Sequence, residues 1–223
     1  MTFVDLALMT GETLLMTVTS SVLAYILGLP CGILLNVTAK KGLRPCKAVN
    51  FIAGLIVNVL RSVPCLIVIV LCIPFTRAVF GRMSGEWYTI IIPVTVCAFG
   101  FVSRMVEQSL AEVPTGEIEA IKSLGASDAF VIREVLLPES KPSLIIGTAV
   151  VFVNVLGYTS FAYNIAAGGL ISGVYNYYKL NTANYFSSPW FWILIGVVVL
   201  IVQAAQETGI KLAKKTDKRR SLK

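Results

Sequence analysis

Five stretches of predominantly apolar residues are the feature that most restricts what this chain can fold into. About 20 apolar residues are enough for one α-helix to cross the hydrocarbon core of a bilayer. With 56% hydrophobic and only 14% charged residues among 223, the composition excludes an ordinary soluble domain and a disordered chain. We therefore expect an all-α, polytopic membrane protein with five transmembrane helices. The expected spans cover residues 13–37, 51–75, 86–105, 143–167 and 190–210.

The positions of the basic residues predict how these spans are oriented. The loops before span two and between spans three and four, together with the segment after span five, hold 15 of the 19 Lys and Arg residues. The opposite side has only Arg77, Arg82 and Lys179. Because loops rich in Lys and Arg stay in the cytoplasm, we expect the N-terminus outside and the C-terminus inside. Residues 211–223 then form a basic cytoplasmic tail that contacts anionic lipid.

Arg61 is the one basic residue inside an expected span. A charge at the bilayer centre costs about 3 kcal/mol unless it faces protein or water. We therefore expect Arg61 to cap a helix broken at Pro64 or to lie near the cytoplasmic surface, ahead of a role in lining a transport pathway. Other polar residues within spans either line such a pathway or form hydrogen bonds between helices. They are Asn58, Asn154, Tyr158, Thr159 and Asn164.

The segment between spans three and four, residues 104–142, is long for a simple connection. Its central part, residues 113–138, predicts two short helices joined by a turn. Pro114 suits the start of the first helix, and Gly125 suits the left-handed conformation just beyond its end. Ser127 is a suitable N-cap for the second helix, which we expect Pro138 to end.

The first of these helices is amphipathic. Its apolar stripe consists of Ile118, Ala120, Ile121 and Leu124, and acidic residues occupy the rest of its surface. An isolated helix of this length is only marginally stable in water. Its order must therefore come from packing against the bundle, the membrane or another protein.

The same segment resembles a known signature. Permease subunits of ABC importers carry E-A-A, three residues, G, nine residues and I-x-L-P, and this chain has Glu119-Ala120, Gly125 and Leu137-Pro138 at those spacings. Ile121 replaces the second Ala and Val135 replaces the Ile, and both substitutions keep an apolar side chain. The chain is thus similar to the binding-protein-dependent type I ABC permeases.

Within that family, the chain resembles the permeases of methionine importers from about Gly11 to about Lys214, least clearly after Leu170. The runs that carry this resemblance include Arg61-Ser62-Val63-Pro64, Ile73-Pro74-Phe75-Thr76-Arg77, Met105-Val106-Glu107, Glu112-Val113-Pro114-Thr115-Gly116, Gly157-Tyr158 and Ala167-Gly168-Gly169-Leu170.

The resemblance implies a single permease domain over residues 1–223 that imports methionine, including its D-enantiomer, across a bacterial inner membrane. It implies a homodimer bound to two ATP-binding ABC subunits and served by an external substrate-binding lipoprotein. Glu119 and Ala120 would cap and pack the coupling helix, Gly125 would form its turn, and Leu137-Pro138 would relay motion into span four.

The chain contains no phosphate-binding loop, so we expect ATP and Mg²⁺ on the partner ATPase and no cofactor, metal or catalytic residue in this chain. We expect no nucleic-acid partner, because the basic residues lie between spans. Three alternatives stay open: a permease for cystine or another amino acid or small sulfur compound, an ion-coupled secondary carrier, and a non-transporting assembly factor. The absence of His and of acidic residues deep in a span disfavours the carrier.

Overall fold

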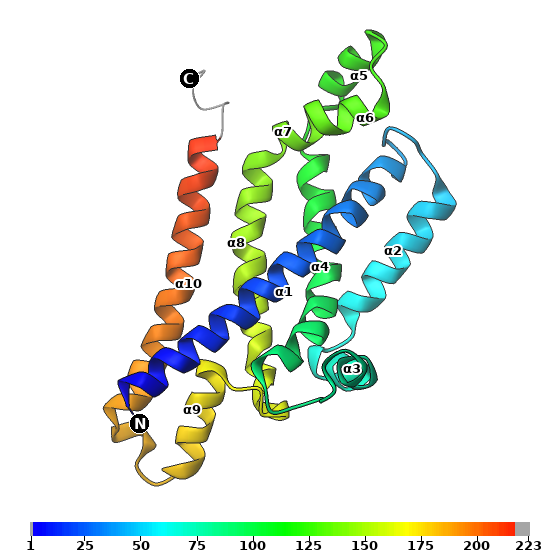
Figure 1. Cartoon of the computed structure of the whole chain (residues 1–223). Coiled ribbons are helices and arrows are strands. Elements are labelled where there is room, and N and C mark those ends of the chain that lie inside the picture. Colours follow the sequence, from blue (N-terminus) through cyan, green and yellow to red (C-terminus); the bar gives the residue numbers. More distant parts are fainter. Residues whose placement is uncertain (1, 217–223) are drawn as a thin grey trace. The chain divides into compact units, whose positions relative to one another are not determined.

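The computed structural model describes residues 2–216, and within that range the chain is all-α with no β-strand. Four helical segments are individually long and apolar enough to cross a membrane. A bent helix pair supplies a fifth crossing if it counts as one span (Figure 1). The four are α1 (Phe3–Thr38), η1 (Trp87–Ile90) with α4 (Ile91–Ala111), α8 (Lys141–Tyr158) with η3 (Thr159–Ile165), and α10 (Pro189–Thr216).

The second expected span, residues 51–75, is not one straight helix. The structure has α2 (Lys47–Ser62) and α3 (Cys65–Phe80), which meet at an angle of 107°. Pro64 lacks a backbone N–H, and its ring disfavours helical geometry at Val63, so the helix breaks there. The Pro64 carbonyl then accepts the N–H groups of Ile67 and Val68 and starts α3. Arg61 lies in the last turn of α2, directly before this break.

Three other spans are longer than expected, and one of them is the third, which continues to Ala111. The first helix begins at Phe3 rather than at residue 13. Asp5 Oδ2 accepts the Thr2 N–H at 2.7 Å and the Thr2 hydroxyl accepts the Asp5 N–H at 3.2 Å, which is a reciprocal capping arrangement. The last helix continues to Thr216, and Lys211 donates to Glu207 one turn earlier at 2.8 Å. Residues 211–216 of the basic tail are thus helical, and residues 217–223 lie outside the described residues.

Shorter elements connect the spans. They are α5 (Thr115–Ser123), α6 (Asp128–Phe130), η2 (Val131–Leu136, in π-helical geometry), α7 (Leu137–Glu139), α9 (Gly169–Leu180) and η4 (Tyr185–Ser187). The chain divides into two compact units. The first unit holds residues up to Ala24, Ser62–Ala98 and Val151–Ala205; the second holds Tyr25–Arg61, Phe99–Val150 and residues from Gln206 onward.

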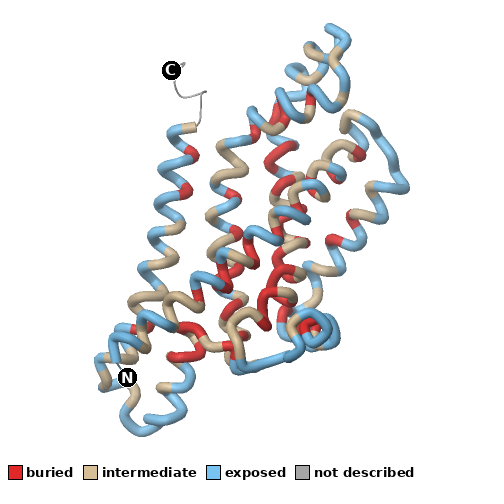
Figure 2. The backbone as a smooth tube through the Cα atoms, in the orientation of Figure 1, coloured by how far each residue is buried: buried red, intermediate tan, exposed pale blue. Residues whose placement is uncertain are grey.

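Burial is concentrated on the span formed by η1 and α4 (Figure 2). In its most apolar stretch 67% of the residues are buried, against 11% in that of α10. In the second unit α1 lies directly against α4. A Cβ atom at Gly28 would come within 2.7 Å of Val102 Cγ1, and one at Gly32 within 2.6 Å of the Ser103 carbonyl oxygen. Small residues four apart allow this close backbone approach.

Candidate functional site

The expected coupling segment lies entirely in the second unit, and its first helix has the predicted boundaries. Helix α5 covers Thr115–Ser123, with Pro114 just before it and Glu117 in its first turn, where the helix dipole favours negative charge. Gly125 has φ +84°, and its N–H donates to the Lys122 carbonyl at 3.0 Å. The prediction of a left-handed glycine after the helix is therefore confirmed.

The second helix starts as expected but does not end at Pro138. The Ser127 hydroxyl accepts the Phe130 N–H at 3.3 Å and so caps α6. The chain then passes through the π-helical turn Val131–Leu136 and remains helical to Glu139. A π turn is wider than an α turn, so the proline ring avoids the carbonyl four residues earlier that would otherwise stop the helix. The expectation that Pro138 forbids continuation was wrong for this reason.

The segment therefore joins α8 almost without interruption. The Ser140 N–H and hydroxyl both donate to the Leu136 carbonyl, at 3.1 and 2.6 Å, and the Leu144 N–H donates to the Ser140 carbonyl at 2.9 Å. Leu137 is half-buried and Pro138 is exposed. These bonds link the residues on either side of the signature Leu137-Pro138 pair and continue into the start of α8.

The expected apolar stripe of α5 divides into two parts. Ile118 and Ile121 are half-buried, whereas Ala120 is exposed and Leu124 is 86% exposed. Phe130, on the other side of the turn, is 51% exposed. Two large apolar side chains thus flank the Gly125 turn in contact with solvent.

A charged cluster that sequence reasoning did not single out holds this turn together. Asp128 accepts hydrogen bonds from Lys122 Nζ at the end of α5 and from Arg44 Nε in the loop between α1 and α2. These bonds, first from Lys122 and then from Arg44, hold the pKa of the Asp128 carboxyl below its usual range. The only sequence signal was a set of loop charges that we had used for orientation.

Replacing Asp128 with Asn should loosen the α5 turn, because both cations lose their charged acceptor. We expect amide hydrogen exchange in residues 115–124 to become a few fold faster. A carboxyl with a lowered pKa contributes stability above its unfolded pKa of about 3.9 and loses it only as the pH falls through the folded value. The effect should therefore be equal at pH 6 and pH 8. Glu134→Gln, an exposed carboxylate on the same segment, serves as the control; equal exchange in both variants would contradict the prediction.

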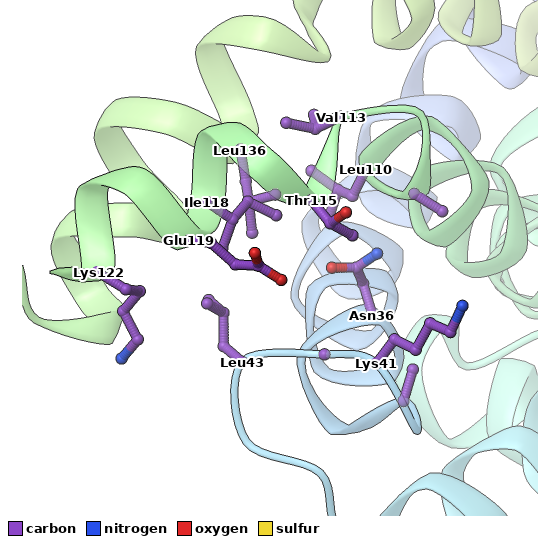
Figure 3. Close-up of a pocket in the computed structure, with 13 residues that line it drawn as sticks. Asn36, Lys41, Leu43, Leu110, Val113, Thr115, Ile118, Glu119, Lys122 and Leu136 are labelled. Atoms are coloured by element: carbon purple, nitrogen blue, oxygen red, sulfur yellow. The ribbon is translucent and has the colours of Figure 1, made fainter.

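A cavity of about 510 Å³ adjoins α5. Its walls combine apolar side chains, including Leu110, Ile118 and Leu136, with the signature residue Glu119. Figure 3 shows the Glu119 carboxylate extending into this space, which Asn36 and Thr115 also border. One side of α5 therefore faces an open space rather than a tightly packed core.

The expected pathway residues divide between the two units. Asn58 and Arg61 belong to the second unit, whereas Asn154, Tyr158 and Thr159 belong to the first. Asn58 Oδ1 accepts from Arg104 at 2.9 Å, and Arg104 also pairs with Glu107 at 2.6 Å, so Asn58 helps to connect α2 with α4. Thr159 is buried and donates to the Leu156 carbonyl of the preceding helical turn at 2.6 Å.

The remaining expected pathway residues are half-buried or exposed. Asn154 and Tyr158 are half-buried, and Asn164 is exposed with its amide donating to the Phe161 carbonyl at 3.4 Å. The side chain of Arg61 is exposed at the end of α2 and its Cγ lies against Gly100 of α4.

Comparison with known proteins assigns the family. Residues 28–207 match the model of the binding-protein-dependent transport system inner membrane component. The probable D-methionine transport system permease protein MetI of Haemophilus influenzae is 33% identical over 210 residues, which cover 94% of this chain and 96% of that protein. The D-methionine transport system permease protein MetI of Escherichia coli K12 is 40% identical over 149 residues, covering 67% and 68% of the two chains.

A solved structure is similar over nearly the whole chain. An inward-facing conformation of the MetNI methionine ABC transporter superposes with a TM-score of 0.90 at 32% identity, covering 96% of this chain and 97% of that one. The family model spans more than half of this chain and includes the coupling segment, three of the expected crossings in full and parts of the other two. This chain therefore belongs to the family of binding-protein-dependent transport system inner membrane components and is a permease subunit of an ABC importer.

Proposed function

We propose that this chain imports methionine, including its D-enantiomer, across a bacterial inner membrane as the permease subunit of an ATP-driven complex. Its similarity to the D-methionine permeases over 94% of its length supports the substrate. The observation that carries the mechanism is the coupling segment, where a charged cluster fixes the turn while Leu124 and Phe130 stay exposed.

We propose that these two exposed side chains dock into an ATPase subunit. Burying an apolar side chain of this size on binding contributes about 1.5–3 kcal/mol, whereas in the free subunit both face water. The complex would contain two copies of this chain and two ATPase subunits, with ATP and Mg²⁺ on the latter. Closure of the ATPases would move α5, and the hydrogen-bonded connection through Leu136 and Ser140 would carry that movement into α8.

The membrane orientation belongs to the same proposal. The segment that contains α5 belongs to the loops with most of the Lys and Arg residues, which supports a cytoplasmic position beside the ATPases. The N-terminus and α9 then lie on the outer side, where an external binding lipoprotein would deliver the substrate.

The test is uptake by proteoliposomes that contain this chain and its ATPase partner, with the external binding protein added. Labelled L- and D-methionine should accumulate only when ATP is supplied to the ATPase side. Uptake without ATP would replace the proposal with a secondary carrier, and failure to transport any amino acid would replace it with an assembly factor. Stronger competition by cystine than by unlabelled methionine would reassign the substrate.

A further inference from the structure

A second cavity, of about 230 Å³, lies in the first unit between the first turns of α1 and those of α9. In the orientation proposed above, it is on the outer side of the membrane. Asp5, Met9 and Glu12 border it from α1, and Ser172 and Asn176 border it from α9. It is separate from the coupling segment, and none of the pathway residues expected from sequence lines it.

Two side chains of α1 hold the start of α9 at this cavity. Glu12 Oε2 accepts the Gly169 N–H at 2.7 Å, and Thr13 Oγ1 accepts the Leu170 N–H at 2.8 Å. The backbone of Gly168 passes so close that a Cβ atom there would lie 2.4 Å from Glu12 Oε2. Glu12 therefore has a fixed position at the positive end of the α9 dipole, which stabilises its charge.

Two carboxylates border the cavity. Asp5 and Glu12 are seven residues apart, which is two helical turns, so both lie on the same face of α1. The described residues that line the cavity include these two carboxylates and no Lys or Arg. One bond to Gly169 uses only part of the accepting capacity of the Glu12 carboxylate, which has about four lone-pair directions.

Ser172 gives an independent indication that the cavity binds something. The residue is only 5% exposed, and its hydroxyl has no hydrogen-bond partner among the described residues. An unpaired buried hydroxyl costs free energy, and this one belongs to a residue that lines the cavity. A ligand with N–H donors would bond both to this hydroxyl and to the carboxylates.

We propose that this cavity binds a primary ammonium group, and specifically the α-ammonium group of the amino acid as it enters from outside. The proposal rests on the proposed import of an amino acid. Glu12 supplies the charge, Ser172 and Asn176 supply further polar contacts, and Met9 forms an apolar part of the wall. A volume of about 230 Å³ holds a small group with a few waters rather than a large ligand.

The test compares Glu12→Gln with the wild type in the uptake assay described above. The Gln amide oxygen can still accept the Gly169 N–H, so the variant removes the charge and keeps the α1–α9 contact. We expect methionine uptake to fall about tenfold, the size of one lost charge-assisted hydrogen bond. Glu86→Gln is the matched control, because Glu86 is another outer-side carboxylate, pairs with Arg82 and does not line the cavity. Uptake by this control should stay within about twofold of wild type.

Methylammonium is the direct probe of the site. It should inhibit uptake by the wild type more strongly than tetramethylammonium at the same concentration, because tetramethylammonium has no N–H donor. Glu12→Gln should abolish that difference. Equal uptake by Glu12→Gln and wild type, or the same preference for methylammonium in both, would overturn the proposal.

Ser172→Ala separates a ligand contact from a purely structural role. Removing an unpaired buried hydroxyl should leave thermal stability unchanged or raise it. Uptake should nevertheless fall a few fold, and unchanged uptake would count against the site.

Two further results would redirect the interpretation. If Glu12→Gln weakens the binding of the substrate-free binding protein to the complex, a lysine of that protein occupies the cavity. The assignment of the cavity to the substrate ammonium group is then wrong. Absence of methionine uptake by the wild type would instead refute the proposed function itself, so the two failures are distinguishable.

Discussion

Replacing Gly125 with Asp should uncouple ATP hydrolysis from methionine uptake. Gly125 has φ +84°, and a side chain there costs about 1–2 kcal/mol in backbone strain. The new carboxylate would also lie three residues from Asp128 and compete for Lys122. Both effects reorient Leu124 and Phe130, which we propose contact the ATPase. We expect uptake to fall at least about tenfold, measured in proteoliposomes together with ATP hydrolysis that persists.

Two variants identify the cause of that loss. Gly116→Asp places the same charge in the first turn of α5, where no positive φ is required, no atom lies within 4 Å of a new Cβ and the dipole favours an acid. Its uptake should stay near wild type. Gly125→Asn tolerates the left-handed conformation better than most residues and adds no charge, so it should retain more uptake than Gly125→Asp. If Gly116→Asp and Gly125→Asp lose uptake equally, added charge and not the turn is responsible.

The coupling segment shows why local structure was predictable here. Its boundaries depend on Pro114, Gly125 and Ser127, and each acts through its own backbone or side-chain chemistry. The continuation of the helix past Pro138 was not predictable in the same way. Whether a proline ends a helix depends on the geometry of the preceding turn, and a π turn has no sequence signature as specific as a glycine or an N-cap.

Contacts between distant parts of the chain were the least accessible to sequence reasoning. Asp128 pairs with Arg44, 84 residues away, and Glu12 binds the Gly169 N–H, 157 residues away. The expected first span began at residue 13, directly after Glu12, because a carboxylate in lipid is costly. The partner of Glu12 at the start of α9 accounts for its position within α1. Hydropathy identified the apolar windows, but it carries no information about which turns of different helices meet.

One long-range contact did have a sequence signal that we overlooked. Gly28 and Gly32 form a G-x-x-x-G pattern in an apolar segment, and such patterns mark close helix packing in membranes. The structure places this face of α1 against Val102, Ser103 and Val106 of α4. Helix α1 continues through Gly28 and through Pro30.

Replacing Gly32 with Ala should therefore destabilise the permease. The added Cβ would lie 2.6 Å from the Ser103 carbonyl oxygen and 2.6 Å from Val106 Cβ. Real Cβ atoms do not approach backbone so closely, and a helix backbone cannot yield as a flexible side chain does, so α1 must shift away from α4. Overpacking of this kind costs about 1–3 kcal/mol, which corresponds to a fall in melting temperature of about 2–10 °C for a chain of this size.

The measurement is thermal unfolding of the detergent-solubilised complex, with Gly11→Ala as the matched control. Gly11 lies in the same helix, and no atom falls within 4 Å of a Cβ placed there. Alanine favours a helix over glycine by up to about 1 kcal/mol, so Gly11→Ala should melt at or slightly above the wild-type temperature. Both substitutions gain this preference for helix. The difference between their melting temperatures therefore measures the effect of the contact of α1 with α4. Equal melting temperatures for Gly32→Ala and Gly11→Ala would contradict the close contact between α1 and α4.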